Sequence, residues 1–101
     1  MARPAKLSKE QVESWLAAHP GWELSGDAIR RTYTFPDFSS AVGFVVRVSL
    51  LAEKCDHHPD IELGWGRAAL TWTTHDAGGL TSLDLELAAG SDAMYPPAKE
   101  R

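Results

Sequence analysis

One stretch of the chain limits its possible folds more than any other. In PDFSSAVGFVVRVSLLAEK, residues 36–54, Arg47 is the only charge between Asp37 and Glu53. No turn signal interrupts the stretch, and a strand of this length would be unusual, so we predict a long helix capped by Asp37. A helix with so little charge is apolar on more than one side, and one sheet face cannot cover all of it.

Two hairpins are predicted, one before this helix and one after it. Residues 22–35 alternate apolar and polar side chains around the turn sequence Ser25-Gly26-Asp27. Residues 61–74 show the same alternation around Gly66-Arg67. In the second hairpin, the side chains predicted to face the core are Ala68, Leu70 and Trp72.

Two shorter helices complete the predicted elements. A capping-box pattern at residues 8–11 starts a helix over residues 9–18, and a second such pattern at residues 81–84 starts the last helix. Gly90 is expected to end that last helix, because glycine commonly follows a helix C-terminus. Residues 91–101 are expected to form a loose tail.

The predicted order is α-β-β-α-β-β-α within a single domain, residues 1–101. Hairpins pair their strands antiparallel, and helices can cover one face of a single sheet. We therefore expect an α+β fold in which a four-stranded antiparallel sheet carries three helices on one face.

Charge and composition argue against several classes of protein. The 101 residues carry a formal net charge of −4, which offers no basic face to a nucleic acid. The longest apolar run is too short to span a membrane, and no apolar segment near the N-terminus indicates a signal peptide. Cys55 is the only cysteine, so no internal disulfide can form, and the reducing cytoplasm is the expected location.

Three histidines are predicted to meet at one end of the second hairpin. His57 and His58 precede its first strand, and His75 follows its second strand. The two open ends of a hairpin lie side by side, so these imidazoles are expected to line one pocket. Neighbouring histidines are poor material for a core, and loops at the ends of strands often carry function.

The residues alone leave three interpretations of this cluster open. A zinc site would need three imidazoles around one ion, but adjacent histidines rarely aim both rings at one metal, and the spacing is not a recognised zinc pattern. Proton transfer suits histidine, because its ordinary pKa lies near neutrality. The third interpretation is a structural role at the surface.

Three further residues near the cluster allow both a functional and a structural interpretation. Glu53 at a helix C-terminus opposes the helix dipole, which favours a role in orienting a histidine. Asp84 fits the capping box of the last helix, and Trp65 fits ordinary packing of the hairpin.

The spacing of these residues resembles that of the pterin-4a-carbinolamine dehydratase family, also called dimerization cofactor of a homeodomain transcription factor. The family signature corresponds here to Glu53, His57-His58-Pro59, Trp65, His75 and Asp84. The segments TTHDAGGLT and FPDFSSAVGFV also look like those of family members. The resemblance covers about residues 15–88 and departs at the last helix, which is expected to be shorter here.

The resemblance implies a hydro-lyase that converts 4a-hydroxytetrahydrobiopterin to quinonoid dihydropterin and water during tetrahydrobiopterin recycling. It implies acid/base catalysis by histidine, with neither a metal nor an organic cofactor. His57 and His75 are the implied acid and base, in an order left open, and His58 chiefly binds and orients the pterin. Asp56 and the segment Thr73-Thr74-His75-Asp76 are implied to lie along the pocket.

The resemblance also implies a homodimer or homotetramer, assembled through the long helix and through sheet edges. The apolar residues of that helix agree, because one stripe comprises Ala41, Val42, Val45, Val48, Ser49 and Ala52, and further apolar residues are expected outside it at Phe44, Val46, Leu50 and Leu51. The alternative function is a non-catalytic pterin-binding or dimerization/coactivator module. The presence of all three histidines favours the enzyme.

Overall fold

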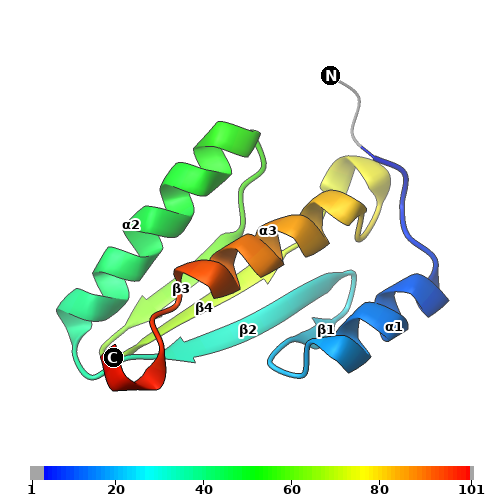
Figure 1. Cartoon of the computed structure of the whole chain (residues 1–101). Coiled ribbons are helices and arrows are strands. Elements are labelled where there is room, and N and C mark those ends of the chain that lie inside the picture. The colour runs from blue at the N-terminus through cyan, green and yellow to red at the C-terminus, as the bar shows by residue number, and fades with distance from the viewer. Residues whose placement is uncertain (1–3, 101) are drawn as a thin grey trace.

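A computed structural model describes residues 4–100, and its elements follow the predicted order (Figure 1). The helices are α1 (Lys9–Ala18), α2 (Phe38–Cys55) and α3 (Ser82–Met94). The strands are β1 (Glu23–Ser25), β2 (Ala28–Thr34), β3 (Asp60–Gly64) and β4 (Arg67–Trp72). Two short 3-10 helices, η1 (His75–Ala77) and η2 (Ala98–Glu100), follow β4 and α3 respectively.

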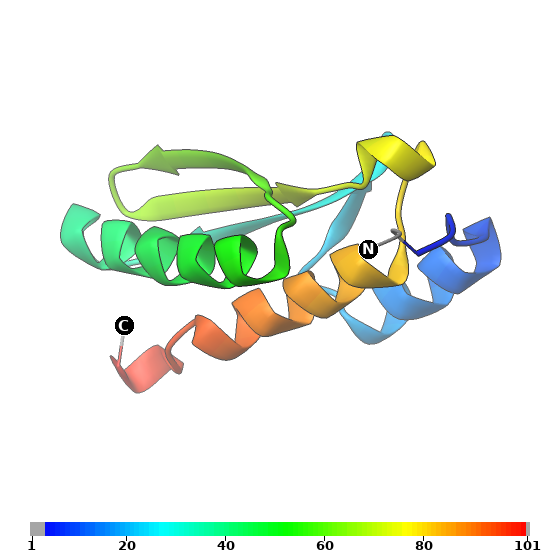
Figure 2. The ribbon, with the colours of Figure 1, turned by 90° about the horizontal axis from the view of Figure 1, so that it is seen from above.

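The four strands form one antiparallel sheet in the order β1-β2-β4-β3. Each hairpin pairs its own two strands, and β2 and β4 join the hairpins along the middle of the sheet. The three α-helices lie on one face of this sheet (Figure 2). The predicted α+β architecture is therefore confirmed, and the start of β3 lies beside the end of β4, where Asp60 is paired with Thr71.

Helix α1 has the predicted bounds and the predicted capping box between Ser8 and Gln11. Helix α2 starts at the predicted cap, where Asp37 accepts a hydrogen bond from the Ser40 backbone N–H at 2.7 Å. This bond lowers the pKa of the Asp37 carboxyl. No helix within residues 4–100 is long and apolar enough to cross a membrane.

The side of α2 that faces the sheet agrees only in part with the predicted stripe, because Val42, Val45 and Ser49 are half-buried and Phe44 is buried in addition. Its buried residues are Ala41, Phe44, Val48 and Ala52, and none is more than 1% exposed. Phe44 was expected outside the stripe, which is wrong, because positions three and four apart share one helix face. The Phe44 ring packs against Tyr33 and Phe35 in the core.

Helix α3 does not end at Gly90 but continues to Met94. An added Cβ atom at Gly90 would lie 2.9 Å from Cδ2 of Leu51 on α2, so the glycine allows α2 and α3 to pack closely. The role of this glycine is interhelical packing rather than helix termination. The helix runs past Gly90 to Met94 and ends before Pro96-Pro97.

The first residues of the expected loose tail are held firmly, so that expectation is wrong for residues 91–95. The Asp92 carboxylate accepts hydrogen bonds from three side chains, those of Trp22, Arg31 and Tyr33. The Tyr95 hydroxyl donates to the backbone carbonyl of Thr34 at 2.8 Å. These contacts hold the end of α3 against β2, which a sequence pattern of local signals does not reveal. Residue 101, the end of that tail, lies outside the described residues.

Candidate active site

His57 is buried, although it follows the exposed end of a helix by two residues. Asp56 turns the backbone into the left-handed region with φ of 49°, and the His57 N–H then bonds to the Ala52 carbonyl at 3.1 Å. This turn directs the imidazole inward, where the residue is only 6% exposed. The expectation that neighbouring histidines avoid the core therefore fails for His57 and holds for His58, which is exposed.

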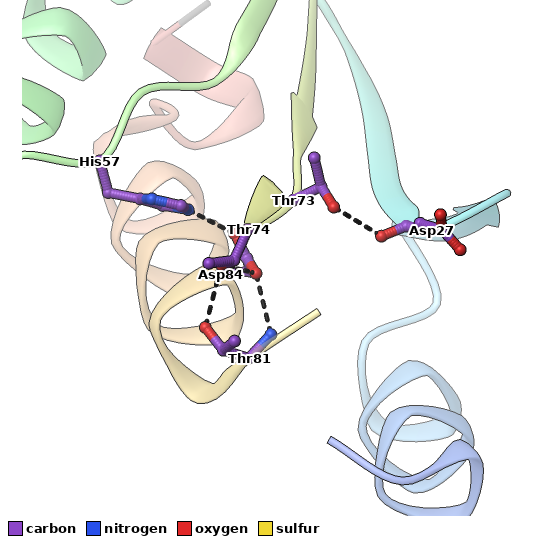
Figure 3. A network of polar contacts seen from close by, with 6 residues as sticks. All are labelled: Asp27, His57, Thr73, Thr74, Thr81 and Asp84. Carbon is purple, nitrogen blue, oxygen red and sulfur yellow. Dashed lines mark hydrogen bonds and ion pairs between the residues drawn. The ribbon is translucent and has the colours of Figure 1, made fainter. Parts of the chain in front are cut away.

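A buried carboxylate meets the His57 ring (Figure 3). His57 Nε2 lies 2.6 Å from Oδ1 of Asp84, which is fully buried. The other oxygen, Oδ2, accepts the Thr74 hydroxyl at 2.7 Å and the Thr81 backbone N–H at 2.9 Å. The predicted cap of α3 is thus confirmed, and the same carboxylate also joins α3 to the histidine loop.

The hydrogen bonds around Asp84 determine which nitrogen of His57 carries a proton. A carboxylate only accepts hydrogen bonds, so Nε2 is the donor to Asp84. In the neutral imidazole, Nδ1 is then the unprotonated nitrogen. The Thr74 hydroxyl gives its proton to Asp84, so the Thr81 hydroxyl donates to Thr74 across their 3.1 Å contact. His57 is left able to accept or return a proton at Nδ1.

His58 lies in a different environment from its neighbour. Its Nε2 contacts Oε1 of Glu53 at 2.5 Å, and both side chains are exposed. The acidic residue near the C-terminus of α2 therefore meets a histidine, as its unfavourable position in the helix dipole suggested. Glu53 lies where it can orient the His58 ring.

His75 begins η1, directly after the Thr74 residue that binds Asp84. Both His75 and Asp76 are exposed at the same end of the sheet as the His57 loop. Within residues 4–100, no hydrogen bond or ring contact links the three imidazoles to one another. The fold brings the histidine-bearing segments together, and the imidazoles make separate contacts.

The other predicted pocket residues divide into exposed and engaged side chains. Asp56 is exposed at the end of α2. The Thr73 hydroxyl donates to the Asp27 carbonyl in the β1–β2 turn at 2.7 Å (Figure 3). Thr74 is buried, its backbone pairs with Gly79, and its hydroxyl holds Asp84. Thr74 therefore supports the site by holding the Asp84 carboxylate in place.

Trp65 lies away from the three histidines of the site. It sits in the β3–β4 turn, at the opposite end of the hairpin from His57, and is 74% exposed. Ordinary hairpin packing does not account for a side chain this exposed.

Trp72 is a neighbour of the site that the sequence interpretation assigned only to the core. Its ring lies nearly parallel to the His57 ring, with 5.9 Å between centroids and 18° between planes. The residue was correctly predicted to face inward, but the identity of its neighbour depends on the turn at Asp56, for which no sequence signal was recognised.

The described residues do not form a preassembled metal centre. Within residues 4–100, no group of three or more His, Cys, Asp or Glu side chains is arranged to hold a metal ion. The buried group built by His57, Asp84 and Thr74 instead has the composition of a proton-transfer site, with one imidazole oriented by one carboxylate.

The fold and site define a class of small α+β proteins in which a buried His–Asp pair and two further histidines lie at one end of a single sheet. The sequence profile of the family described as pterin 4 alpha carbinolamine dehydratase matches residues 5–94. The chain belongs to the pterin-4a-carbinolamine dehydratase family.

Individual relatives support this assignment over most of their length. A protein of Roseiflexus sp. (strain RS-1) is 47% identical over 89 residues, which cover 88% of this chain and 96% of the relative. A protein of Bradyrhizobium sp. (strain ORS 278) is 50% identical over 91 residues, covering 88% and 91% of the two chains. Both are named, provisionally, as pterin-4-alpha-carbinolamine dehydratases.

Two solved structures share the fold. A transcriptional coactivator/pterin dehydratase from Brucella melitensis is 36% identical, with a TM-score of 0.85 over 90% of this chain and 99% of that one. A pterin dehydratase-like protein described as a RuBisCO assembly factor in the alpha-carboxysome has a TM-score of 0.62 at 18% identity. That match covers 76% of this chain and 89% of the other, and its likeness concerns the fold alone.

Proposed function

We propose that this protein dehydrates 4a-hydroxytetrahydrobiopterin, a pterin-4a-carbinolamine, to quinonoid dihydropterin and water in tetrahydrobiopterin recycling. The observation that carries the proposal is the buried His57 ring, held by Asp84 and left with Nδ1 as its proton acceptor. Membership of the family supplies the substrate class.

The reaction needs one proton donor and one proton acceptor. The bond between C4a and its hydroxyl oxygen breaks after that oxygen gains a proton, and water leaves. The neighbouring ring nitrogen loses a proton, and its electron pair forms the new C=N bond. One proton enters the substrate and one leaves it, so a pair of imidazoles can balance the reaction near neutral pH without a redox partner.

The three histidines receive different roles in this proposal. His57 and His75 exchange the two protons, one from the buried side of the site and one from the exposed side. His58, paired with Glu53, binds and orients the pterin. Asp56 and Asp76, which are exposed beside these histidines, face the amino and amide edge of the pterin, while Thr73 and Thr74 shape the strand end behind it.

A second candidate function is a non-catalytic pterin-binding or dimerization/coactivator module. The description of the Brucella melitensis relative as a transcriptional coactivator/pterin dehydratase favours keeping this candidate. The complete set of histidines and the Asp84 network favour the enzyme, because a binding module has no need of an oriented proton carrier.

Substitution of each histidine tests the proposed function. His57→Ala or His75→Ala should lower kcat by about 10²- to 10⁴-fold, the usual contribution of a general acid or base. His58→Ala should raise KM more than it lowers kcat. His19→Ala is the matched control, because His19 follows the end of α1, where its ring meets Trp15, and lies outside the site. Near-wild-type kinetics in all three site variants would show that the site is wrongly assigned.

We further propose that the protein is a homodimer or homotetramer that packs through α2. The outer side of this helix exposes Phe38, Val46 and Leu50, which are spaced four or eight residues apart and are about half exposed or more. A row of exposed apolar side chains on one helix is typical of an interface.

A further inference from the structure

We infer that Trp72 is a positioning residue, which sets the direction of the His57 imidazole; its role in catalysis rests on the proposed function. Trp72 is the last residue of β4 and is fully buried. Its indole lies almost parallel to the imidazole, at 5.9 Å between centroids and 18° between planes.

A single hydrogen bond does not hold an imidazole in one orientation. Nε2 lies off the axis of the Cβ–Cγ bond, so its hydrogen bond to Asp84 restrains rotation of the ring about that axis, but a hydrogen bond tolerates angular deviations of about 30° and leaves the ring a range of tilts. Nδ1 lies off the axis, and its direction depends on that rotation. A flat ring beside the imidazole face limits the rotation on that side. Trp72 therefore fixes where Nδ1 points, and Nδ1 is the nitrogen left to exchange a proton.

A tryptophan at position 72 lowers stability in a way that an aliphatic or phenyl side chain would not. Trp72 Nε1 is buried and has no hydrogen-bond partner among the described residues. An unpaired buried donor is unfavourable, and leucine or phenylalanine would fill the core without one. The broad flat face of the indole beside His57 is the property that those smaller residues provide less well or not at all.

The end of β4 supports His57 in two ways. Trp72 and Thr74 are two residues apart, as are side chains on the same side of an extended chain. The Trp72 indole lies nearly parallel to the imidazole, and Thr74 holds the Asp84 carboxylate that binds the Nε2 edge of the ring. The end of β4 thus restrains the His57 ring both beside its plane and at its Nε2 edge.

Steady-state kinetics of Trp72→Leu and Trp72→Phe distinguish a role of the flat indole face from a role in filling the core. Trp72→Leu should lower kcat by about tenfold or more, because a small misplacement of a reacting group has a large effect on rate, while KM changes far less. Trp72→Phe, which keeps a flat ring, should recover most of kcat. Trp72→Met replaces the Leu variant if that variant folds poorly, since methionine fills irregular space without a flat face.

The matched control is a second indole–imidazole stack elsewhere in the protein. Trp15 on α1 and His19, the residue directly after this helix, have ring centroids 3.9 Å apart and planes 13° apart. Trp15→Leu removes an indole from a histidine outside the site, and it should leave kcat unchanged.

Proton and nitrogen NMR of the histidine rings gives a readout that does not depend on activity. The indole should shift the carbon-bound ring protons of His57 upfield in the wild type. This shift should be lost in Trp72→Leu and partly kept in Trp72→Phe, while Nε2 stays protonated in all three because Asp84 is intact. Trp15→Leu should move only the His19 signals.

The inference is overturned if Trp72→Leu or Trp72→Met keeps kcat within about twofold of the wild type, a loss too small for a misdirected proton carrier. It is equally overturned if the His57 ring signals do not respond to the loss of the indole. A wild-type protein without dehydratase activity would instead refute the proposed function, and the NMR experiment would still test whether the indole lies over the His57 ring in solution.

Discussion

Two adjacent histidines lie in opposite environments because one residue before them turns the chain. The left-handed Asp56 directs His57 into the core, and His58 remains at the surface beside Glu53. A buried imidazole needs a polar partner, and Asp84 supplies it. The split gives one dipeptide a fixed, buried imidazole and an exposed one, which is what the proposed roles of the two histidines require.

Replacing Asp84 with asparagine should change the tautomer of His57 while keeping the shape of the site. The Thr74 hydroxyl and the Thr81 N–H both donate to one oxygen, so the amide oxygen of the introduced asparagine should stay there. Its NH₂ group then faces Nε2, which must become the acceptor, and Nδ1 becomes protonated. We expect Asp84→Asn to lower kcat by about 10²- to 10⁴-fold, as a wrong tautomer does in other enzymes.

Nitrogen NMR of the His57 ring and steady-state kinetics check this prediction together. Glu86→Gln serves as the comparison, because Glu86 is an exposed acid on the same helix as Asp84 and is not a partner of His57. A normal kcat in Asp84→Asn, with Nδ1 shown to be protonated, would contradict the role given to Nδ1.

At the residue scale, two features of the site could be predicted from the sequence. The capping role of Asp84 follows from local spacing, and the meeting of the histidine-bearing segments follows from the second hairpin. The sequence did not allow the burial of His57 or its contact with Trp72 to be predicted. Those features depend on how the end of α2 meets the end of β4, and these two places are far apart in the chain.

Helix α3 connects the site with the opposite part of the sheet, since its two ends hold different networks. Its first turn carries Asp84 to His57, and its last turn carries Asp92 to Tyr33 and two other donors. Burial, and then the Asp92 carboxylate, raise the pKa of the Tyr33 hydroxyl, which stays protonated as a donor. The helix is thus anchored at both ends by a carboxylate.

Asp92→Ala should weaken the fold without altering the chemistry. The substitution leaves the Tyr33 hydroxyl and the Trp22 indole N–H without their acceptor, and it removes the ion pair with Arg31. We expect a loss of about 2–3 kcal/mol in the free energy of unfolding, measured by urea denaturation.

Glu86→Ala is the control, because Glu86 is an exposed acid on the same helix. It should change the free energy of unfolding by about 0.5 kcal/mol or less. Equal stability of the two variants would show that the Asp92 network does not anchor α3.

At the element scale, caps and turns made most boundaries predictable. Helix α1 has the bounds that its capping box indicated, and α2 starts after Asp37 as expected. The end of α3 was predicted wrongly because Gly90 was interpreted as a local stop signal. Its actual role concerns contact with Leu51 on another helix, and such contacts cannot be derived from local sequence.

On the scale of the whole molecule, the outer side of α2 exposes apolar side chains to solvent. Val46 lies near the middle of that surface and is 51% exposed. Val46→Asp places a charge in the proposed interface, where burying it would be costly, so the variant should dissociate. Sedimentation equilibrium at micromolar concentration should give a dimer or tetramer for the wild type and an 11.0 kDa species for the variant.

Ser14→Asp, at an exposed position of α1, adds one negative charge as Val46→Asp does and serves as the control for a change in net charge. Its position lies on a different helix from the apolar row of α2. A wild-type protein of 11.0 kDa in the same experiment would refute the oligomer.

At the scale of the whole molecule, the hairpins and the one-sided helix layer followed from the order of elements. The strand order β1-β2-β4-β3 did not, because the pairing of β2 with β4 joins segments separated by the whole of α2. The site depends on this pairing, since it holds Thr73 beside the Asp27 turn and places Trp72 under His57.

The central claim is that this chain dehydrates a 4a-hydroxypterin with its own histidines. The most direct test is the rate at which purified wild-type protein, after exhaustive treatment with a chelator, removes the absorbance of 4a-hydroxytetrahydrobiopterin. We expect the same acceleration before and after chelation. No acceleration above the uncatalysed reaction, or a loss of activity on chelation that zinc restores, would contradict it.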